Sequence, residues 1–211
     1  MSSYIDKKRE NNDAIIPPLR YLGDKQLMQP QPLVTLSQLH SQEFQQKLKA
    51  LPIAMKQYGG IGIAAPQIGW WTQVFCFGIN GYNPRYPNTI DLQLTTWINP
   101  VIKWSSKETN WMWEGCLSVP RMRGWVERPC EIKLSGWNES GMEIEKHLKG
   151  LAARIAQHEL DHLHGILFTH RVPGKEFLVP QASIDARDHW AKDWPTAGSY
   201  RTAIGDLCME R

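Results

Sequence analysis

Two histidines separated by three residues are the most informative chemical feature of the sequence. His158 and His162 stand in the segment HELDH, which matches the pattern H-E-x-x-H. On an α-helix, residues four apart differ by only about 40° of rotation, so both imidazoles would point to one place, with Glu159 about a quarter turn away. Such a pair beside a carboxylate is typical of metal-dependent hydrolases. The sequence therefore predicts a divalent metal held by His158 and His162, with Glu159 as the proton carrier.

A catalytic metal of this kind needs a third protein ligand. The extended pattern H-E-x-x-H-x-x-G-x-x-H fails here because Phe168 stands at its last position. Glu176 is a poor candidate, since it lies in a stretch flanked by proline and glycine with no helical pattern. Cys116 in the segment EGCLS is the better one, because Gly115 permits close approach of the backbone. Its thiolate would complete a tetrahedral site with one open position for water.

Other interpretations of these segments are less well supported than a catalytic metal site. A single histidine is more often a core or surface residue than a ligand, but two at this spacing with an intervening glutamate favour a metal site. A structural zinc site would need a fourth Cys or His ligand, and the sequence contains no C-x-x-C pair. The segment GIGIAAPQIG superficially fits the dinucleotide pattern G-x-G-x-x-A. It follows a helical stretch and leads into a strand, which is the wrong context for that function.

Composition favours one soluble domain over residues 1–211. Hydrophobic residues make up 42% and charged residues 21% of the chain, as in ordinary globular proteins. The formal charge of +3, without a basic stripe, argues against sequence-specific nucleic-acid binding, and no apolar run approaches the roughly 20 residues of a membrane span. The amino terminus lacks a secretory pattern, and four sparse cysteines are expected to stay reduced, so we expect a cytoplasmic protein.

The elements that must position these residues suggest an α+β fold. Apolar periodicity predicts a helix over 37–58, with Pro52 as a kink or restart, and a second helix over 151–165 that carries HELDH. The segments between them read as strands, with a hairpin turn at NESG; they are 71–79, 95–104, 111–120, 130–137 and 142–148. We therefore expect antiparallel β-sheets packed around a central metal-binding α-helix. A weak helical pattern follows Pro180.

Three segments together resemble the peptide deformylase family. The family motifs GφGφAAPQ, EGCφS and QHExDHLxG, with φ an apolar residue, are met in order by Gly60–Gln67, Glu114–Ser118 and Gln157–Gly165. The resemblance spans about residues 19–172 and identifies the chain as a single deformylase-like catalytic domain. The amino-terminal arm (1–18), the loop at 80–92 and the carboxy-terminal tail (175–211) match no motif, and their roles are left open.

The resemblance implies a role for each matching position. The metal ligands would be Cys116, His158 and His162, and the catalytic residues would be Glu159, the Gln67 side chain and the Leu117 backbone N–H. Gly62 would bind the substrate backbone. The implied reaction removes the N-formyl group from the amino-terminal methionine of newly synthesised polypeptides and releases formate. In it, metal-bound water attacks the formyl carbon, Glu159 serves as general base and acid, and two N–H donors stabilise the oxyanion.

The implied cofactor is one divalent metal ion. A cysteine ligand suits softer ions, so Fe(II), Zn, Ni or Co would be accepted, and the resemblance favours Fe(II) in the cell. The implied partners are N-formylmethionyl nascent peptides and the ribosome near its exit tunnel, with no membrane partner. The methionine side chain would enter an apolar pocket lined by Ile61, Leu151 and Ile155, although plain core positions are an equal interpretation of these three residues.

Overall fold

The computed structural model describes residues 16–81 and 91–196. Its α-helices are α1 (Leu36–Leu39), α2 (Gln42–Gln57), α3 (Gly150–Leu163) and α4 (Gln181–Asp185). Short 3₁₀ helices are η1 (Ala65–Ile68), η2 (Phe168–His170), η3 (Lys175–Phe177) and η4 (Arg187–His189). Most of the predicted arm (1–18), most of the loop (80–92) and the end of the tail lie outside the described residues.

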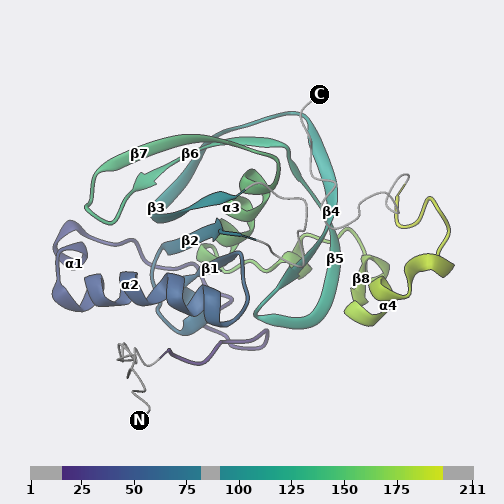
Figure 1. The fold of residues 1–211 in the computed structure, drawn as a ribbon, viewed down its shortest axis with the longest axis horizontal. Helices are drawn as coiled ribbons and strands as arrows, with labels where there is room; N and C mark the ends of the chain where they lie inside the picture. Colours follow the sequence, from purple (N-terminus) through teal and green to yellow (C-terminus); the bar gives the residue numbers. More distant parts are fainter. Residues whose placement is uncertain (1–15, 82–90, 197–211) are drawn as a thin grey trace, which may run out of the picture.

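Two antiparallel sheets form the framework (Figure 1). The larger sheet has the order β1-β2-β3-β6-β7, and its strands are β1 (Gly62–Ala64), β2 (Val74–Ile79), β3 (Leu92–Ser105), β6 (Glu131–Trp137) and β7 (Glu143–Lys149). The smaller sheet has the order β4-β5-β8, with β4 (Thr109–Cys116), β5 (Val119–Pro129) and β8 (Leu178–Pro180). The predicted α+β class with antiparallel sheets is therefore confirmed.

The expected restart of the first long helix falls at Ser41 and not at Pro52. The Ser41 hydroxyl accepts a hydrogen bond from Phe44 N and begins α2 as its N-cap, and α2 then continues through Pro52. Proline removes one helical hydrogen bond. The buried face that includes Leu48 and Leu51 continues past it, so the packing of this face against the core favours an unbroken helix.

The predicted hairpin is present, and the segment 111–120 contains the turn of a second one. In the first, β6 and β7 pair from Glu131↔Lys149 to Trp137↔Glu143. In the second, β4 and β5 pair up to Cys116↔Val119, which leaves Leu117 and Ser118 as the turn. Sequence periodicity predicted an extended segment here but not the turn at which the chain reverses direction. The turn places Cys116 at the end of a strand.

Helix α3 packs against strands of both sheets. Its apolar residues, including Ile155 and Leu163, join a core cluster with Phe75 and Trp97 of the larger sheet. The helix ends before Gly165, whose φ of +73° is the left-handed conformation that glycine adopts without strain. The burial of α3 against strands on both sides fixes the direction in which its histidines project.

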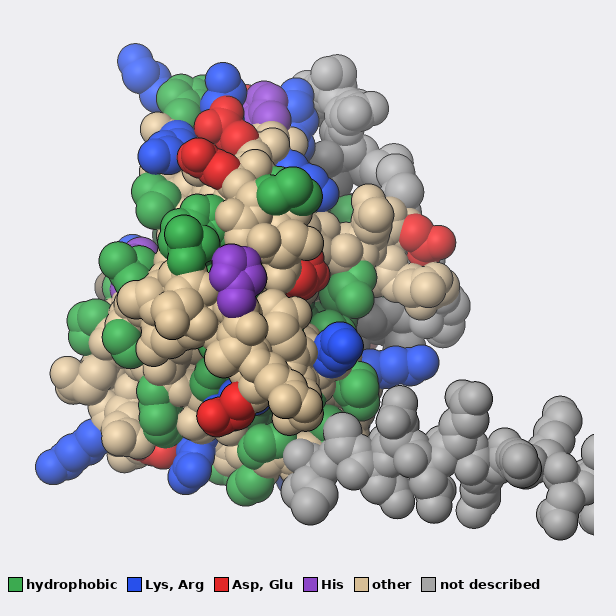
Figure 2. Space-filling view, turned by 90° about the vertical axis from the view of Figure 1, so that its left-hand side faces the viewer, with side chains coloured by type: hydrophobic (Ala, Val, Ile, Leu, Met, Phe, Trp, Pro, Cys, Tyr) green, Lys and Arg blue, Asp and Glu red, His purple; other side chains and the backbone are tan. Residues whose placement is uncertain are grey.

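The surface near α1 carries no block of one charge sign. Figure 2 shows this end of the molecule, where basic, acidic and hydrophobic side chains are interspersed. Among the described residues, none of the helices combines the length and the apolar character needed to cross a bilayer.

Candidate active site and metal centre

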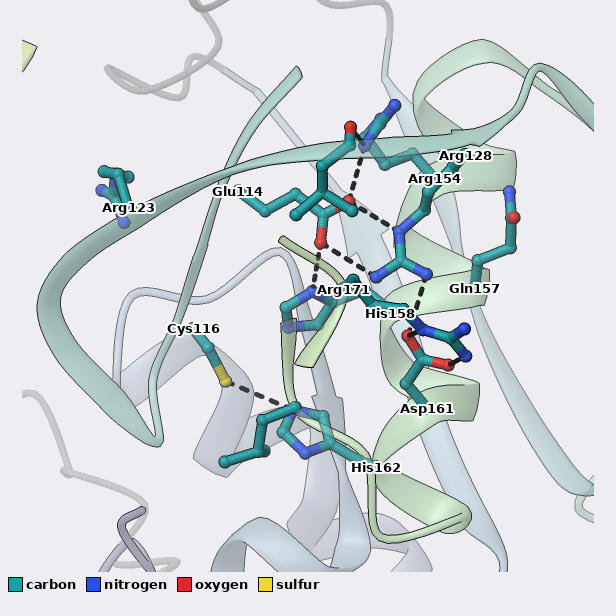
Figure 3. A network of polar contacts seen from close by, with 12 residues as sticks. Glu114, Cys116, Arg123, Arg128, Arg154, Gln157, His158, Asp161, His162 and Arg171 are labelled. Atoms are coloured by element: carbon teal, nitrogen blue, oxygen red, sulfur yellow. Dashed lines mark hydrogen bonds and ion pairs between the residues drawn. The ribbon is translucent and has the colours of Figure 1, made fainter. Parts of the chain in front are cut away.

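Three potential metal ligands converge between β4 and α3. The ligand atoms of Cys116, His158 and His162 all lie within 4.8 Å of one another. Cys116 Sγ lies 3.2 Å from His162 Nε2, and Figure 3 shows the thiol at the end of β4 pointing toward that ring. The structure thus brings together the three residues that the sequence nominated from two separate motifs.

The donor set fits one divalent ion of intermediate softness, because it combines a sulfur with two imidazole nitrogens. Burial lowers the pKa of His162, which keeps this imidazole neutral, as a ligand must be. Burial also disfavours charge on His158, but its bonds with Cys116 and Glu114 raise its pKa well above the usual range. Metal binding at His158 would therefore release a proton.

Glu114 orients the first histidine of the motif. His158 Nδ1 lies 2.9 Å from Glu114 Oε2. Burial alone would raise the pKa of Glu114, but two guanidinium groups and the His158 bond hold it well below its usual range. Because an ionised carboxylate only accepts hydrogen bonds, His158 Nδ1 must be the donor. That tautomer leaves Nε2 free to bind a metal.

A buried ionic network holds Glu114 in place (Figure 3). Arg128 of β5 donates to both Glu114 carboxylate oxygens at 2.6 and 2.9 Å, and Arg154 of α3 donates to one at 2.6 Å. Arg128 also donates to Asp161 at 2.9 Å, and Asp161 accepts from Arg171. The network connects β4 and β5 to α3 and fixes the orientation of the helix face that carries His158.

Sequence reasoning missed these supporting residues. Glu114 belongs to the motif EGCLS but received no role. Arg154 and Asp161 lie on the same helix as the histidines, and Arg154 precedes His158 by four residues in an otherwise apolar stretch. Such a charge on a buried helix face is a usable signal, because buried charges are normally paired.

Glu159 lies buried beside the ligand cluster, with 4% of its surface exposed. Within the described part of the chain, its Oε2 atom has no hydrogen-bond partner. Burial raises the pKa of Glu159 to about 7. A Cβ atom at Gly62 would collide with Glu159 Oε1 and with Ile155, so only glycine lets the β1 backbone approach this carboxyl group. The arrangement suits a residue that exchanges protons near neutral pH.

Gln67 presents its amide nitrogen to the cysteine. Its Oε1 atom accepts from Ala64 N at 2.8 Å, which fixes the amide orientation. Its Nε2 atom donates to Ser118 Oγ at 3.1 Å and lies 3.5 Å from Cys116 Sγ. Leu117 follows Cys116 in the β4–β5 turn, so both predicted oxyanion donors lie next to the ligand cluster.

A cavity opens beside these groups. Its lining includes Ile61, Leu151 and Ile155, the residues predicted to receive methionine, together with Met112, which sequence reasoning did not nominate. The remaining lining residues belong to the three motif segments and their neighbours; they are Gly60, Gly62, Gln67, Trp113, Glu114, Gly115, Cys116, Leu117, Arg154, His158 and Glu159. Apolar walls therefore adjoin the Glu159 carboxyl group and the ligand cluster, as a binding site for an apolar side chain next to a reacting carbonyl requires.

Comparison with known proteins gives a consistent result. The family model described as polypeptide deformylase matches residues 16–177. Peptide deformylase 1 of Nitrosomonas europaea is 39% identical over 158 residues, which cover 75% of this chain and 88% of that protein. A class I type b peptide deformylase from Acinetobacter baumannii, solved with bound Met-Ala-Ser, has 36% identity and a TM-score of 0.72, covering 75% of this chain and 99% of that one. With the matched region spanning all three motifs, the chain belongs to the polypeptide deformylase family.

Proposed function

We propose that the cavity beside α3 is the site at which this enzyme carries out deformylation, with Cys116, His158 and His162 as the ligands of one divalent metal. As a member of its family, the enzyme removes N-formyl groups from nascent polypeptides. The observation that carries the assignment to this cavity is the convergence of one thiol and two imidazoles beside a buried carboxyl group. Elsewhere in the cavity lining, apolar residues provide room for a side chain.

Each protein group has a defined task in this proposal. When bound, the metal supplies Lewis acidity that makes water nucleophilic near neutral pH. Glu159 accepts the proton of the attacking water and returns it to the departing amine, for which a pKa of about 7 is well suited. The Gln67 amide and the Leu117 N–H stabilise the negative charge that develops on the formyl oxygen, at about 3 kcal/mol per donor.

We further propose Fe(II) as the ion in the cell, with Zn, Ni and Co as competent substitutes. The sulfur of Cys116 favours softer ions over Mg or Ca. Anaerobic purification followed by metal analysis tests this assignment. Iron as the main ion is the expected result, and stoichiometric zinc in protein purified from iron-replete cells would contradict it.

The proposed substrate is the formylmethionyl end of a chain leaving the ribosome, so the proposed location of the enzyme is the cytoplasm near the exit tunnel. Ile61, Leu151 and Ile155 line the cavity and would surround the methionine side chain. The described thiols of Cys76 and Cys116 are free, as suits a reducing compartment. Cosedimentation of the enzyme with translating ribosomes tests the proposed association.

The decisive assay compares kcat/KM for formyl-Met-Ala-Ser, acetyl-Met-Ala-Ser and formyl-Asp-Ala-Ser under anaerobic conditions. The relative from A. baumannii was solved with Met-Ala-Ser bound, which is the product that the first peptide would yield. We expect the first peptide to lead each of the others by about a hundredfold or more, because misplacement by about 1 Å can cost that much. Comparable rates for the acetyl peptide would contradict the assignment.

An ordinary metallopeptidase is the competing function, and neither position that would supply its third ligand fits. Phe168 is 1% exposed and stacks near the His158 ring, with centroids 6.2 Å apart. Glu176 lies in η3, outside the ligand cluster found among the described residues. Cleavage of an internal peptide bond at a rate comparable to formate release would favour that alternative.

A further inference from the structure

Tryptophans from two distant parts of the chain form one cluster beside the cavity. Trp113 of β4 lies 5.1 Å from Trp125 of β5, measured between ring centroids. It also lies 5.8 Å from Trp190 and 6.2 Å from Trp194, which are themselves 4.7 Å apart. The segment after α4 therefore supplies two indoles that contact a single residue of the smaller sheet.

The tail from residue 178 onward, which includes this segment, is anchored to the smaller sheet at several points. Strand β8 pairs with β5, and α4 packs against β5 with Ile184 only 5% exposed. Trp125, which is 2% exposed, donates from Nε1 to Thr196 Oγ1 at 3.0 Å. All of these tail contacts begin after residue 177, where the match to the family model ends. The tail is thus an addition to the matched domain and packs on it at defined positions.

Trp113 connects the tail to the cavity. Trp113 is one of the residues that line the cavity, next in sequence to Met112 and Glu114, and it is partly exposed. The indoles of Trp190 and Trp194 support it from the tail side, so rotation of Trp113 would require displacing both. When the methionine side chain occupies the apolar part of the cavity, the following residues of the peptide must extend out of the cavity along one of its walls. Trp113 offers the aromatic surface on the wall supported by the tail.

We propose that Trp190 and Trp194 are specificity-determining positioning residues that hold the Trp113 indole against the substrate residue following formylmethionine. This inference rests on the function proposed above. An aromatic side chain at that substrate position gains a ring contact that alanine lacks. The gain from one aromatic pair corresponds to about a two- to tenfold preference. The effect falls on KM, because the contact lies away from the reacting carbonyl and is made equally in the ground and transition states.

The test measures kcat and KM for formyl-Met-Phe-Ser and formyl-Met-Ala-Ser in the full-length holoenzyme. We expect the wild type to prefer the Phe peptide severalfold through a lower KM. The double variant Trp190→Ala/Trp194→Ala should abolish this preference while kcat for the Ala peptide stays within about twofold. Trp113→Ala should abolish the preference as well. Adding the tail substitutions to Trp113→Ala should change the preference no further, since the tail acts through Trp113.

Matched controls separate positioning from general damage. Trp104→Ala removes a 45% exposed indole from β3 of the other sheet and should leave the preference intact. The variant Trp190→Phe/Trp194→Phe should retain most of it, because aromatic support is kept. If the double alanine variant does not fold, Trp113→Ala and Trp190→Leu/Trp194→Leu take its place, with leucine keeping apolar volume but losing the aromatic contact.

Binding of the product peptides gives a second readout that does not depend on turnover. The Kd of Met-Phe-Ser should be severalfold lower than that of Met-Ala-Ser in the wild type, and equal in the tail variant. Equal loss of activity on both peptides, an unchanged preference, or independent effects of Trp113 and the tail would overturn the inference. Absence of formate release by the wild type would instead overturn the proposed function, while the binding comparison would still test the tail.

Discussion

Glu159 stands between the two proposed ligand histidines in the sequence, yet its environment differs from theirs. Its carboxyl group is buried, and in the described structure one of its oxygens has no hydrogen-bond partner. An unpaired buried carboxylate is costly, and here the cost appears as the rise of its pKa to about 7. A residue that served only stability would be expected to have a partner. This is why we assign Glu159 to proton transfer and not to the scaffold.

The first prediction concerns that assignment. Glu159→Gln keeps the shape of the side chain but removes its ability to exchange a proton. Turnover of formyl-Met-Ala-Ser should fall by about a hundredfold or more, the scale of general-base catalysis. Metal content and the melting temperature should remain near those of the wild type, as measured by elemental analysis and calorimetry. Near-normal turnover in this variant would remove Glu159 from the mechanism.

The second prediction concerns Glu114, which we regard as a positioning residue. Glu114→Gln removes the buried negative charge that Arg128 and Arg154 share, leaves Arg128 paired with Asp161 alone, and weakens the bond that orients His158. Breaking a buried ion pair typically costs about 3–5 kcal/mol. Loss of a partner that orients a ligand typically lowers metal affinity by about 10–100-fold. Denaturant unfolding and competition with a chelator measure the two effects.

The matched control is Glu131→Gln, which weakens a surface ion pair with Lys149 at 3.3 Å. The Glu131 side chain is 32% exposed, so its loss should cost less than about 1 kcal/mol. If both variants lost the same small amount of stability, the buried network would not have the role assigned to it.

At the scale of single elements, the end of α3 is fixed by a contact with the amino-terminal segment. Gln31 N donates to Leu163 O at 2.8 Å, and Gly165 adopts a φ of +73° immediately after the helix. A Cβ atom at Gly165 would lie 2.6 Å from the backbone carbon of Met28. Only glycine therefore allows the chain to turn here and the amino-terminal segment to cover the helix end.

The third prediction follows from this crowding. Gly165→Ala should destabilise the fold by about 2 kcal/mol or more, since it adds a backbone collision to the cost of a left-handed alanine. Gly59→Ala is a close control, because Gly59 has a similar φ of +70° but nothing lies within 4 Å of the position that an added methyl group would take. That control should cost only about 1–2 kcal/mol. Equal losses of unfolding free energy in the two variants would show that the contact with Met28 is unimportant.

At the scale of the whole molecule, the proposed metal site combines residues from separate parts of the chain. Cys116 comes from the smaller sheet, whereas His158 and His162 come from a helix that also packs on the larger one. An ion bound by all three ligands binds the native state and not the unfolded chain, so it should stabilise the assembled fold by mass action.

The fourth prediction concerns metal removal. A chelator should lower the melting temperature of the wild type, because metal present at a hundred times its Kd adds about 2.7 kcal/mol. Cys116→Ala should bind metal weakly and show little further change with chelator, since two imidazoles alone rarely retain an ion. Cys130→Ala, at another buried cysteine, should keep its metal and its chelator response. Full metal occupancy in Cys116→Ala would point to a different third ligand.

The features determined by the sequence alone are those that depend on short-range geometry. The spacing of His158 and His162 defines their common direction once the segment is helical, and the strict alternation after Cys130 defines one hairpin. Helix boundaries were less predictable. A kink or restart was expected at Pro52, but helix α2 begins at the N-cap Ser41 and continues through Pro52. The buried face of the helix extends beyond the proline, and this tertiary packing outweighs the local preference of proline.

The tertiary structure alone decided how distant segments combine. Sequence motifs nominated Cys116 as the third ligand, but its 3.2 Å distance from His162 depends on a turn at Leu117 and Ser118 that periodicity did not reveal. The bonds of Glu114 to two arginines, and the support of Trp113 by the tail, likewise join residues far apart in the chain. Such contacts are set by burial and packing over the whole fold, and local spacing carries no information about them.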